Sequence, residues 1–233
     1  MSRTTRYEGL LPVEALKGSK VMIVGVGAGG RQVAVQLAVM GVGGLCLVDY
    51  DQVEEVNLGT QGWGVNQVGL PKVEACRATL RGINPLCRVT VENRAFCDQI
   101  APWPVLFCCV DSMQARKRVF EAWASTHLAR SRPRDVLFLD ARMAAGSCRV
   151  LSVADEDDAT YYRKEALFGD EEALQEGCTT RGTFYGAYID AGLLVSEWAR
   201  WLRGKERLRD FLFSFDMGVS QVLHRQEKGA KEN

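Results

Sequence analysis

The 233-residue chain lacks several features that would assign a class of protein at once. No run approaches the roughly 18 consecutive apolar residues of a membrane-spanning helix. Lys and Arg number 29, as do Asp and Glu, and no long block of one charge occurs. That balance argues against a basic surface for nucleic acid or membranes. Residues 1–15 also lack the apolar core of a signal peptide. These absences predict a cytoplasmic protein with no nucleic-acid or membrane partner.

Metal-binding and catalytic motifs are scarce as well. The eight cysteines form no C-x-x-C pair, so the usual spacing of a zinc site is missing and no zinc is expected. The two histidines follow no serine or cysteine catalytic pattern, and no G-x-x-x-x-G-K-[ST] phosphate loop occurs. A chain of this size buries roughly 70–75% of its unfolded surface. It therefore needs neither a disulfide nor a metal in order to fold.

Glycine, in contrast, is concentrated in residues 20–61. A short apolar strand is predicted at residues 21–24. Gly25, Gly27 and Gly30 follow in the spacing G-x-G-x-x-G, and a helical pattern continues from there. The first glycine permits a tight turn, the second lets backbone approach a phosphate, and the third lets helix and strand pack closely. The N–H groups at the start of the helix would then face the phosphate.

A second predicted strand, residues 45–48, delivers Asp49 at its end. This carboxylate comes about twenty residues after the glycines, where it can accept hydrogen bonds from ribose hydroxyls. Strand, helix and acid each follow the glycines in the expected order. This arrangement predicts a nucleotide-binding α/β fold more strongly than the glycines alone.

The residues after Asp49 are unusually polar for a dehydrogenase. The segments DYDQVEEVNLGTQ, GLPK and INP resemble the D-x-D-x-V-E-x-x-N-L-x-R-Q, G-x-x-K and I-N-P pattern of the ThiF/MoeB family. These are adenylating enzymes related to ubiquitin-activating enzymes. The resemblance implies a Rossmann-like α/β fold, with a mostly parallel sheet and helices on both faces. It further implies ATP and Mg²⁺ as cofactors, a homodimer or heterodimer, and a ubiquitin-like or sulfur-carrier partner with a C-terminal glycine.

The resemblance also implies roles for individual residues. Gly25, Gly27 and Gly30 would admit the nucleotide, and Asp49 would hold the ribose. The groups around the phosphates would be Asp51, Asn57, Gln61 and Lys72. Asp111 would hold magnesium, and Cys178 would be the sulfur nucleophile. The alternatives are a surface lysine at position 72, a helix N-cap at Asp111 (a role that Ser112 could also fill) and a buried thiol at Cys178.

Two arginines of the family pattern are missing. Thr60 stands in place of the arginine in N-L-x-R-Q, and Gly9 in place of the second arginine of an N-terminal R-Y-x-R-Q segment. A triphosphate needs a second cation beside one lysine and magnesium. Arg6, Arg142 and Arg181 are the candidates. Arg142 is preferred because it follows the predicted strand 135–139, although it could instead pair with Asp140.

The predicted organisation is an N-terminal arm (1–19), one adenylation domain (20–225) and a polar tail (226–233). Within the domain, residues 154–180 are expected to form a crossover loop with one short helix near 161–167. Their acidic run is interpreted as a solvated surface. The remaining predicted elements are helices at 71–81, 113–130 and 186–202, and strands at 88–91, 105–110, 148–153 and, last, 211–215.

Two other functions remain open. The missing arginines permit a non-catalytic or partner-dependent subunit of a heterodimeric activating enzyme. An NAD-dependent oxidoreductase would rest on the glycine pattern alone.

Overall fold

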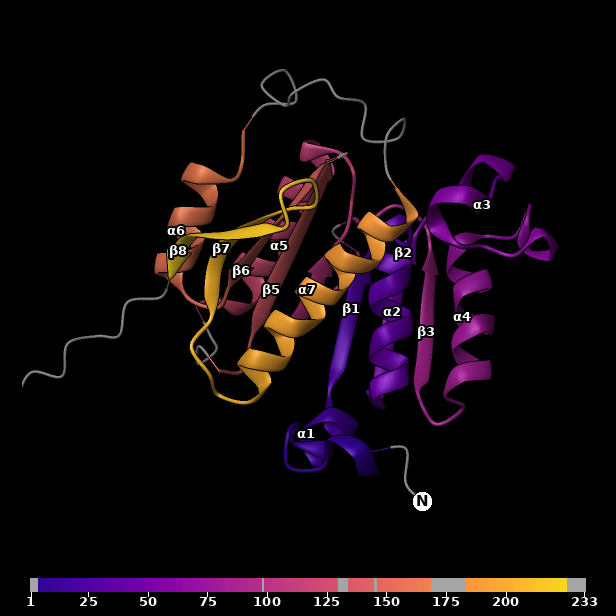
Figure 1. The fold of residues 1–233 in the computed structure, drawn as a ribbon, viewed down its shortest axis with the longest axis horizontal. Coiled ribbons are helices and arrows are strands. Elements are labelled where there is room, and N and C mark those ends of the chain that lie inside the picture. The colour runs from indigo at the N-terminus through magenta and orange to yellow at the C-terminus, as the bar shows by residue number, and fades with distance from the viewer. Residues whose placement is uncertain (1–3, 98, 130–133, 145, 169–182, 226–233) are drawn as a thin grey trace, which may run out of the picture.

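The computed structural model describes residues 4–97, 99–129, 134–144, 146–168 and 183–225. The described residues form one sheet with the strand order β3-β2-β1-β4-β5-β6-β7-β8 (Figure 1). The strands are β1 Lys20–Val24, β2 Gly44–Asp49, β3 Arg88–Asn93, β4 Val105–Cys108, β5 Leu137–Ala144, β6 Ser147–Val153, β7 Leu208–Ser214 and β8 Val219–Arg225. Neighbours from β3 to β5 pair in parallel, and those from β5 to β8 pair antiparallel. The expected Rossmann-like α/β fold is confirmed.

Helices cover both faces of this sheet. They are α1 Val13–Gly18, α2 Ala28–Met40, α3 Glu55–Gln61, α4 Lys72–Ile83, α5 Met113–His127, α6 Glu156–Glu165 and α7 Phe184–Leu202. Side chains of α2, α4 and α7 share one apolar cluster, and those of α5 and α6 share the other. Strand β1 sends Val21 and Ile23 into the first cluster and Met22 and Val24 into the second. Burial on both faces explains its unbroken apolar sequence.

The direction of winding reverses between β1 and β4. Strand β1 leads into α2 on one face, whereas its sheet neighbour β4 leads into α5 on the other face. A crevice forms outside the carboxyl ends of strands at such a reversal, and ligands bind there in open α/β sheets. The glycine-rich turn after β1 and Asp111 after β4 both lie at this edge, which is called the ligand edge below.

The N-terminal arm packs against the sheet at the opposite end. Helix α1 lies far from α3 in Figure 1. Leu16 of α1 is fully buried in the cluster that contains α2, and the Tyr7 hydroxyl donates a hydrogen bond to the carbonyl of Met40. Arg6, on the 3₁₀ turn Thr5–Tyr7, is exposed.

The expected short helix near 161–167 is present but begins within the acidic run, of which Glu156 and Asp157 are exposed as predicted. Helix α6 starts at Glu156, and the Asp155 side chain caps it by accepting a hydrogen bond from the N–H of Asp158 at 2.8 Å. Asp158 itself is buried and accepts bonds from the N–H of Ala154 and from Arg207, 49 residues further along. The contact with Arg207 thus replaces the water that a buried Asp158 carboxylate would otherwise need. Residues 169–182 of the expected crossover and the tail 226–233 lie outside the described residues.

Strand β5 is longer than predicted, and β7 is not the last strand. Asp140 and Arg142 lie inside β5 rather than after it, because antiparallel pairing with β6 places them opposite Leu151 and Arg149. Strand β8 then pairs with β7 across two register shifts. Its Val219 and Leu223 are largely exposed, so the strand lacks the buried apolar run that marks β1. No helix among the described residues is long and apolar enough to cross a membrane.

Candidate functional site at the ligand edge

The turn between β1 and α2 is packed too closely for any residue but glycine at two positions. Gly25 has φ +89°, and a Cβ there would overlap the carbonyl oxygen of Cys109. A Cβ on Gly30 would overlap the carbonyl oxygen of Gly25. Backbone hydrogen bonds hold the same crossing, from Gly25 N to Val48 O at 2.9 Å and from Cys109 N to Val24 O at 2.7 Å. Gly25 and Gly30 therefore bring the ends of β1, β4 and α2 together.

Gly27 differs from both. A Cβ at this position would meet nothing nearer than the Gln61 amide nitrogen at 4.0 Å. Gly27 is also the N-cap of α2 and supplies no side-chain cap to the first N–H groups of the helix. Open space in front of uncapped N–H groups fits a phosphate. The turn thus offers space and unpaired donors to an anionic group.

The Asp49 carboxylate is hydrogen-bonded to the backbone of the same turn. Its Oδ2 accepts a bond from the N–H of Val26 at 2.6 Å, and its Oδ1 accepts one from the N–H of Asp51 at 2.8 Å. The residue is 8% exposed, and burial raises the pKa of its carboxyl group. In this structure Asp49 ties the end of β2 to the glycine-rich turn. Its expected contact with ribose remains a prediction.

Lys72 is buried at the start of α4 and is not the surface lysine of the alternative interpretation. Its ammonium contacts Asp51 Oδ2 at 2.7 Å, and its backbone N–H donates to the Asp51 carbonyl at 2.9 Å. The lysine side chain is 7% exposed and that of Asp51 is 45% exposed. The pair therefore presents a carboxylate to solvent with a positive charge directly behind it. Pro71 precedes the helix as its N-cap rather than lying in its first turn.

Helix α3 carries the other two predicted phosphate ligands. Asn57 Oδ1 accepts a bond from the N–H of Glu54 at 3.0 Å, which caps the helix start. Gln61, the last helical residue, lies beside Gly27 and accepts a bond from Trp63 Nε1 at 2.9 Å. Arg31 was not among the site residues predicted from the sequence. It is buried, and its guanidinium lies 4.8 Å from the centre of the Trp63 ring. Only its position one residue after the third glycine could have signalled it.

Asp111 is exposed at the ligand edge, two residues after the Cys109 carbonyl that touches Gly25. The alternative role as a helix cap belongs to Ser112, whose hydroxyl accepts a bond from the N–H of Ala115 at 3.2 Å. An exposed carboxylate here would supply the kind of oxygen ligand that magnesium prefers. The predicted metal role of Asp111 is therefore chemically suitable and remains a prediction.

Arg142 is bound to Asp140, as the alternative interpretation supposed. Its Nε and Nη2 both donate to Asp140 Oδ2 at 3.0 Å, and its guanidinium lies 5.5 Å from the Phe168 ring. Its Nη1 is buried and has no hydrogen-bond partner among the described residues. Arg142 lies inside β5 and does not follow the strand as predicted. Whether Arg142 also meets a phosphate remains a prediction.

Four of the described cysteines are poor candidates for a nucleophile. Burial raises the pKa of Cys76, Cys108 and Cys148 to about 12, and that of Cys109 well above its usual range. The predicted nucleophile, Cys178, and the third cation candidate, Arg181, lie outside the described residues. Among the residues that are described, no three His, Cys, Asp or Glu side chains gather as a metal-binding group.

The sequence profile of the ThiF family matches residues 3–233. The chain belongs to the ThiF family. It is similar to ubiquitin-like modifier-activating enzyme 5 of Bombyx mori, with 35% identity over 122 residues, covering 46% of this chain and 31% of that protein. It is also similar to molybdopterin-synthase adenylyltransferase of Escherichia coli, with 38% identity over 112 residues, covering 46% of this chain and 45% of that protein.

Solved structures of the ThiF fold extend the likeness over nearly the whole chain. The microcin C7 biosynthetic enzyme MccB in complex with N-formylated MccA has a TM-score of 0.76 at 17% identity, covering 97% of this chain and 72% of that one. The E. coli MccB structure with ATP has a TM-score of 0.72 at 16% identity, covering 97% and 71%. The aligned segments span less than half of the two sequence relatives described above. Because the identity to MccB is only 16–17%, the likeness to its structures establishes the fold alone.

Proposed function

We propose that this chain is an ATP-dependent adenylating domain that activates the C-terminal carboxylate of a small protein. The main support is the convergence of three groups at the ligand edge. These are the open position at Gly27 before the N-terminus of α2, the buried Lys72 paired with Asp51, and the exposed Asp111. The membership in the ThiF family and the similarity to a named adenylyltransferase support the same class of reaction.

In this proposal the triphosphate lies along the glycine-rich turn, with the Lys72 ammonium beside it. The substrate carboxylate oxygen attacks the α-phosphorus, the bond from that phosphorus to the bridging oxygen breaks, and pyrophosphate leaves with the bonding electrons. Asp111 would hold magnesium, which supplies positive charge to the phosphate oxygens. The protein contributes orientation and charge stabilisation more than covalent chemistry. Asp49, Asn57 and Gln61 would hold the ribose and the phosphate chain in line.

The proposed substrate is a ubiquitin-like or sulfur-carrier protein that ends in glycine. Two relatives point this way, since one is named for activating a ubiquitin-like modifier and another for molybdopterin synthase. The Cys178 thiolate would then attack the acyl carbon of the adenylate and release AMP, forming a thioester. The chain is proposed to act as a homodimer or as half of a heterodimer.

Isotope exchange between ATP and pyrophosphate tests the proposal. The substrates are the small β-grasp proteins of the source cell that end in Gly-Gly, each paired with a variant lacking the last glycine. Exchange should require the complete C-terminus and should fall at least about a hundredfold in Asp111→Ala. Cys178→Ala should keep exchange and lose the thioester.

Three outcomes would contradict parts of this proposal. Absence of exchange with every complete carrier, including one added with a candidate partner subunit, would reject adenylation. Near wild-type exchange in Asp111→Ala would reject the metal role. Equal loss of exchange and thioester in Cys178→Ala would make that cysteine structural.

A further inference from the structure

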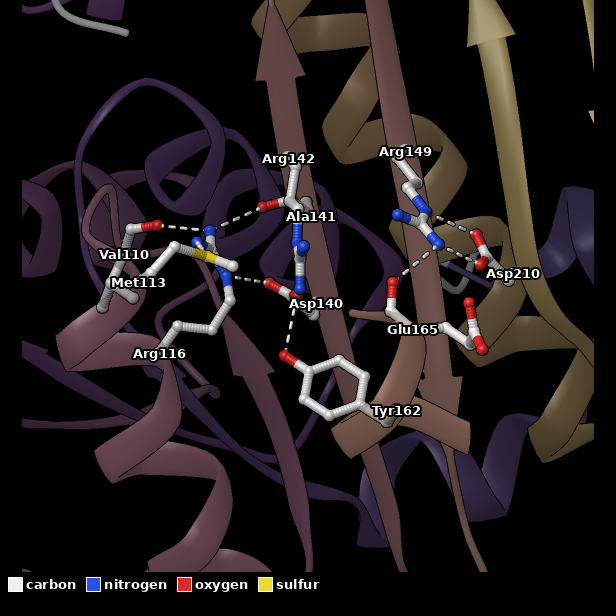
Figure 2. A network of polar contacts seen from close by, with 10 residues as sticks. All are labelled: Val110, Met113, Arg116, Asp140, Ala141, Arg142, Arg149, Tyr162, Glu165 and Asp210. Atoms are coloured by element: carbon white, nitrogen blue, oxygen red, sulfur yellow. Dashed lines mark hydrogen bonds and ion pairs between the residues drawn. The ribbon is translucent and has the colours of Figure 1, made fainter. Parts of the chain in front are cut away.

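A buried arginine contacts the backbone of Val110, the residue before Asp111. Arg116, in the first turns of α5, is 4% exposed. Its Nη2 donates to the carbonyl oxygen of Val110 at 2.6 Å and to that of Ala141 at 3.2 Å, and its Nε donates to Asp140 Oδ1 at 2.7 Å. Figure 2 shows the guanidinium between the Val110 carbonyl and the Asp140 carboxylate. Arg116 therefore joins the end of β4 to the neighbouring strand β5.

Asp140 in turn is held from several directions. It is fully buried, and besides Arg116 it accepts bonds from Arg142 and from the Tyr162 hydroxyl at 2.8 Å. Tyr162 belongs to α6, so the network connects two strands and two helices (Figure 2). A carboxylate with donors on both oxygens cannot rotate without breaking a bond. The Arg116 guanidinium consequently has a fixed anchor on its Nε side.

The contact with Val110 determines the geometry of the next residue. Val110 and Asp111 share one planar peptide unit, so a fixed Val110 carbonyl also fixes the plane that contains the Asp111 nitrogen. Only residues 109–112 separate β4 from α5, and the first of them, Cys109, donates its N–H to the Val24 carbonyl at 2.7 Å. Ser112 holds the other end as the cap of α5, so Arg116 adds a side-chain contact to the peptide unit that directly precedes Asp111.

We propose that Arg116 is a positioning residue that aims the Asp111 carboxylate at the ligand edge, where it would hold the divalent cation of the bound nucleotide. This inference rests on the proposed function. A lysine at position 116 could keep one bond to Asp140 but could not span Asp140 and the Val110 carbonyl together, because it lacks the planar fork of arginine. Groups that orient a metal ligand typically change metal affinity by roughly 10–100-fold when replaced.

The chain offers a matched control for Arg116→Lys. Arg149 on β6 makes a similar paired contact with Asp210, at 2.9 Å from Nε and 2.5 Å from Nη2. It also reaches a backbone carbonyl, that of Glu165, at 3.5 Å. Figure 2 shows this second pair separate from the first. Arg149→Lys should therefore remove an equivalent contact between a guanidinium and a carboxylate without touching the segment that carries Asp111, with a smaller cost in stability because the Arg149 side chain is 24% exposed against 5% for Arg116.

Three measurements on the full chain test the inference. Titration of ATP by calorimetry, in Mg²⁺ and in EDTA, gives the metal-dependent part of binding. Hydrogen exchange of residues 109–113 reports the order of the loop, and urea unfolding reports stability. Arg116→Lys should raise the Mg²⁺ concentration for half-maximal ATP binding by about tenfold. It should leave ATP binding in EDTA within about twofold, and exchange in residues 109–113 should become faster.

The outcomes separate this inference from the proposed function. In an Asp111→Ala background, Arg116→Lys should cause no further change in the Mg²⁺ requirement, because its effect passes through Asp111. Equal Mg²⁺ requirements in Arg116→Lys and Arg149→Lys would overturn the positioning role, as would an undiminished effect in the Asp111→Ala background. Absence of pyrophosphate exchange in the wild type would reject adenylation. The ATP calorimetry and the hydrogen exchange of residues 109–113 would still test the positioning role of Arg116.

Discussion

Asp190 is a buried acid close to the glycine-rich turn. It lies on α7, is 3% exposed, and its Oδ2 would be 3.2 Å from a Cβ on Gly29. Burial raises the pKa of Asp190 to about 7, helped by the negative charge of Asp140 and opposed by a hydrogen bond from Cys148. The folded protein thus retains a proton between about pH 4 and pH 7 that the unfolded chain releases. Stability must fall as the pH rises through that window.

Asp190→Asn should remove this loss, because asparagine is neutral and has nearly the same shape. The variant should be more stable than the wild type by roughly 2–4 kcal/mol at pH 8 and similar to it at pH 4. Urea unfolding at the two pH values measures the difference. Burial raises the pKa of Glu197 to about 7 as well, so part of the pH dependence should remain. The exposed Asp157→Asn serves as control and should change stability by less than about 0.5 kcal/mol. Parallel stability curves for Asp190→Asn and the wild type would contradict the assignment.

Individual residues show where sequence reasoning succeeds and where it stops. Asp51 and Lys72 are 21 residues apart, yet a motif identified both, and the structure pairs them at 2.7 Å. Arg116 and Asp140 have no motif of their own in the sequence analysis. Their pairing depends on how α5 crosses β5, which is a property of tertiary packing. Arg142 illustrates a third case. The sequence allowed either a phosphate contact or a pair with Asp140, and the structure shows the pair with Asp140.

At the scale of elements, the glycine-rich turn separates structural from ligand-facing glycines. Gly25→Ala should destabilise the protein by roughly 2–5 kcal/mol, since alanine at φ +89° is strained and its Cβ would overlap Cys109 O. Gly27→Ala should cost less than about 1 kcal/mol in stability, because its Cβ would point into open space. The same methyl group should weaken ATP binding by about tenfold or more, as it would occupy the space meant for phosphate.

Urea unfolding and ATP calorimetry on the two variants provide the measurement, and each variant is the other's control. Normal stability in Gly25→Ala would show that the turn can relax away from Cys109. Unchanged ATP affinity in Gly27→Ala would place the phosphates elsewhere.

The elements that the sequence missed have a common cause. The start of α6 consists of consecutive acids, which normally indicates a solvated surface. Glu156 and Asp157 are exposed, but Asp158 is buried against Arg207, which lies 49 residues away in the sequence. Strand β8 has an exposed, mixed sequence, so its existence depends on the free edge of β7 rather than on its own pattern. Elements with local signals, such as β1 and β2, were predicted to within a few residues.

For the whole molecule, ligand binding should appear as added stability. A ligand that binds only the folded state stabilises it by about 2.7 kcal/mol at 100 times its Kd. For a chain of this size that corresponds to a rise in Tm of roughly 5–11 °C. ATP with Mg²⁺ should produce such a rise, EDTA should reduce it, and NAD at the same concentration should leave Tm within about 1 °C.

The reason lies in the ligand edge as a whole. Asp49 alone would suit the ribose of either nucleotide, whereas Lys72, with its charge behind Asp51, and the exposed Asp111 suit a metal-bound triphosphate. Asp111→Ala is the control, and its Tm should respond to ATP equally with and without Mg²⁺. A larger rise with NAD than with ATP would favour the oxidoreductase interpretation. Equal rises for ATP in Mg²⁺ and in EDTA with the wild type would show that the nucleotide is held by the turn and Lys72 without a metal.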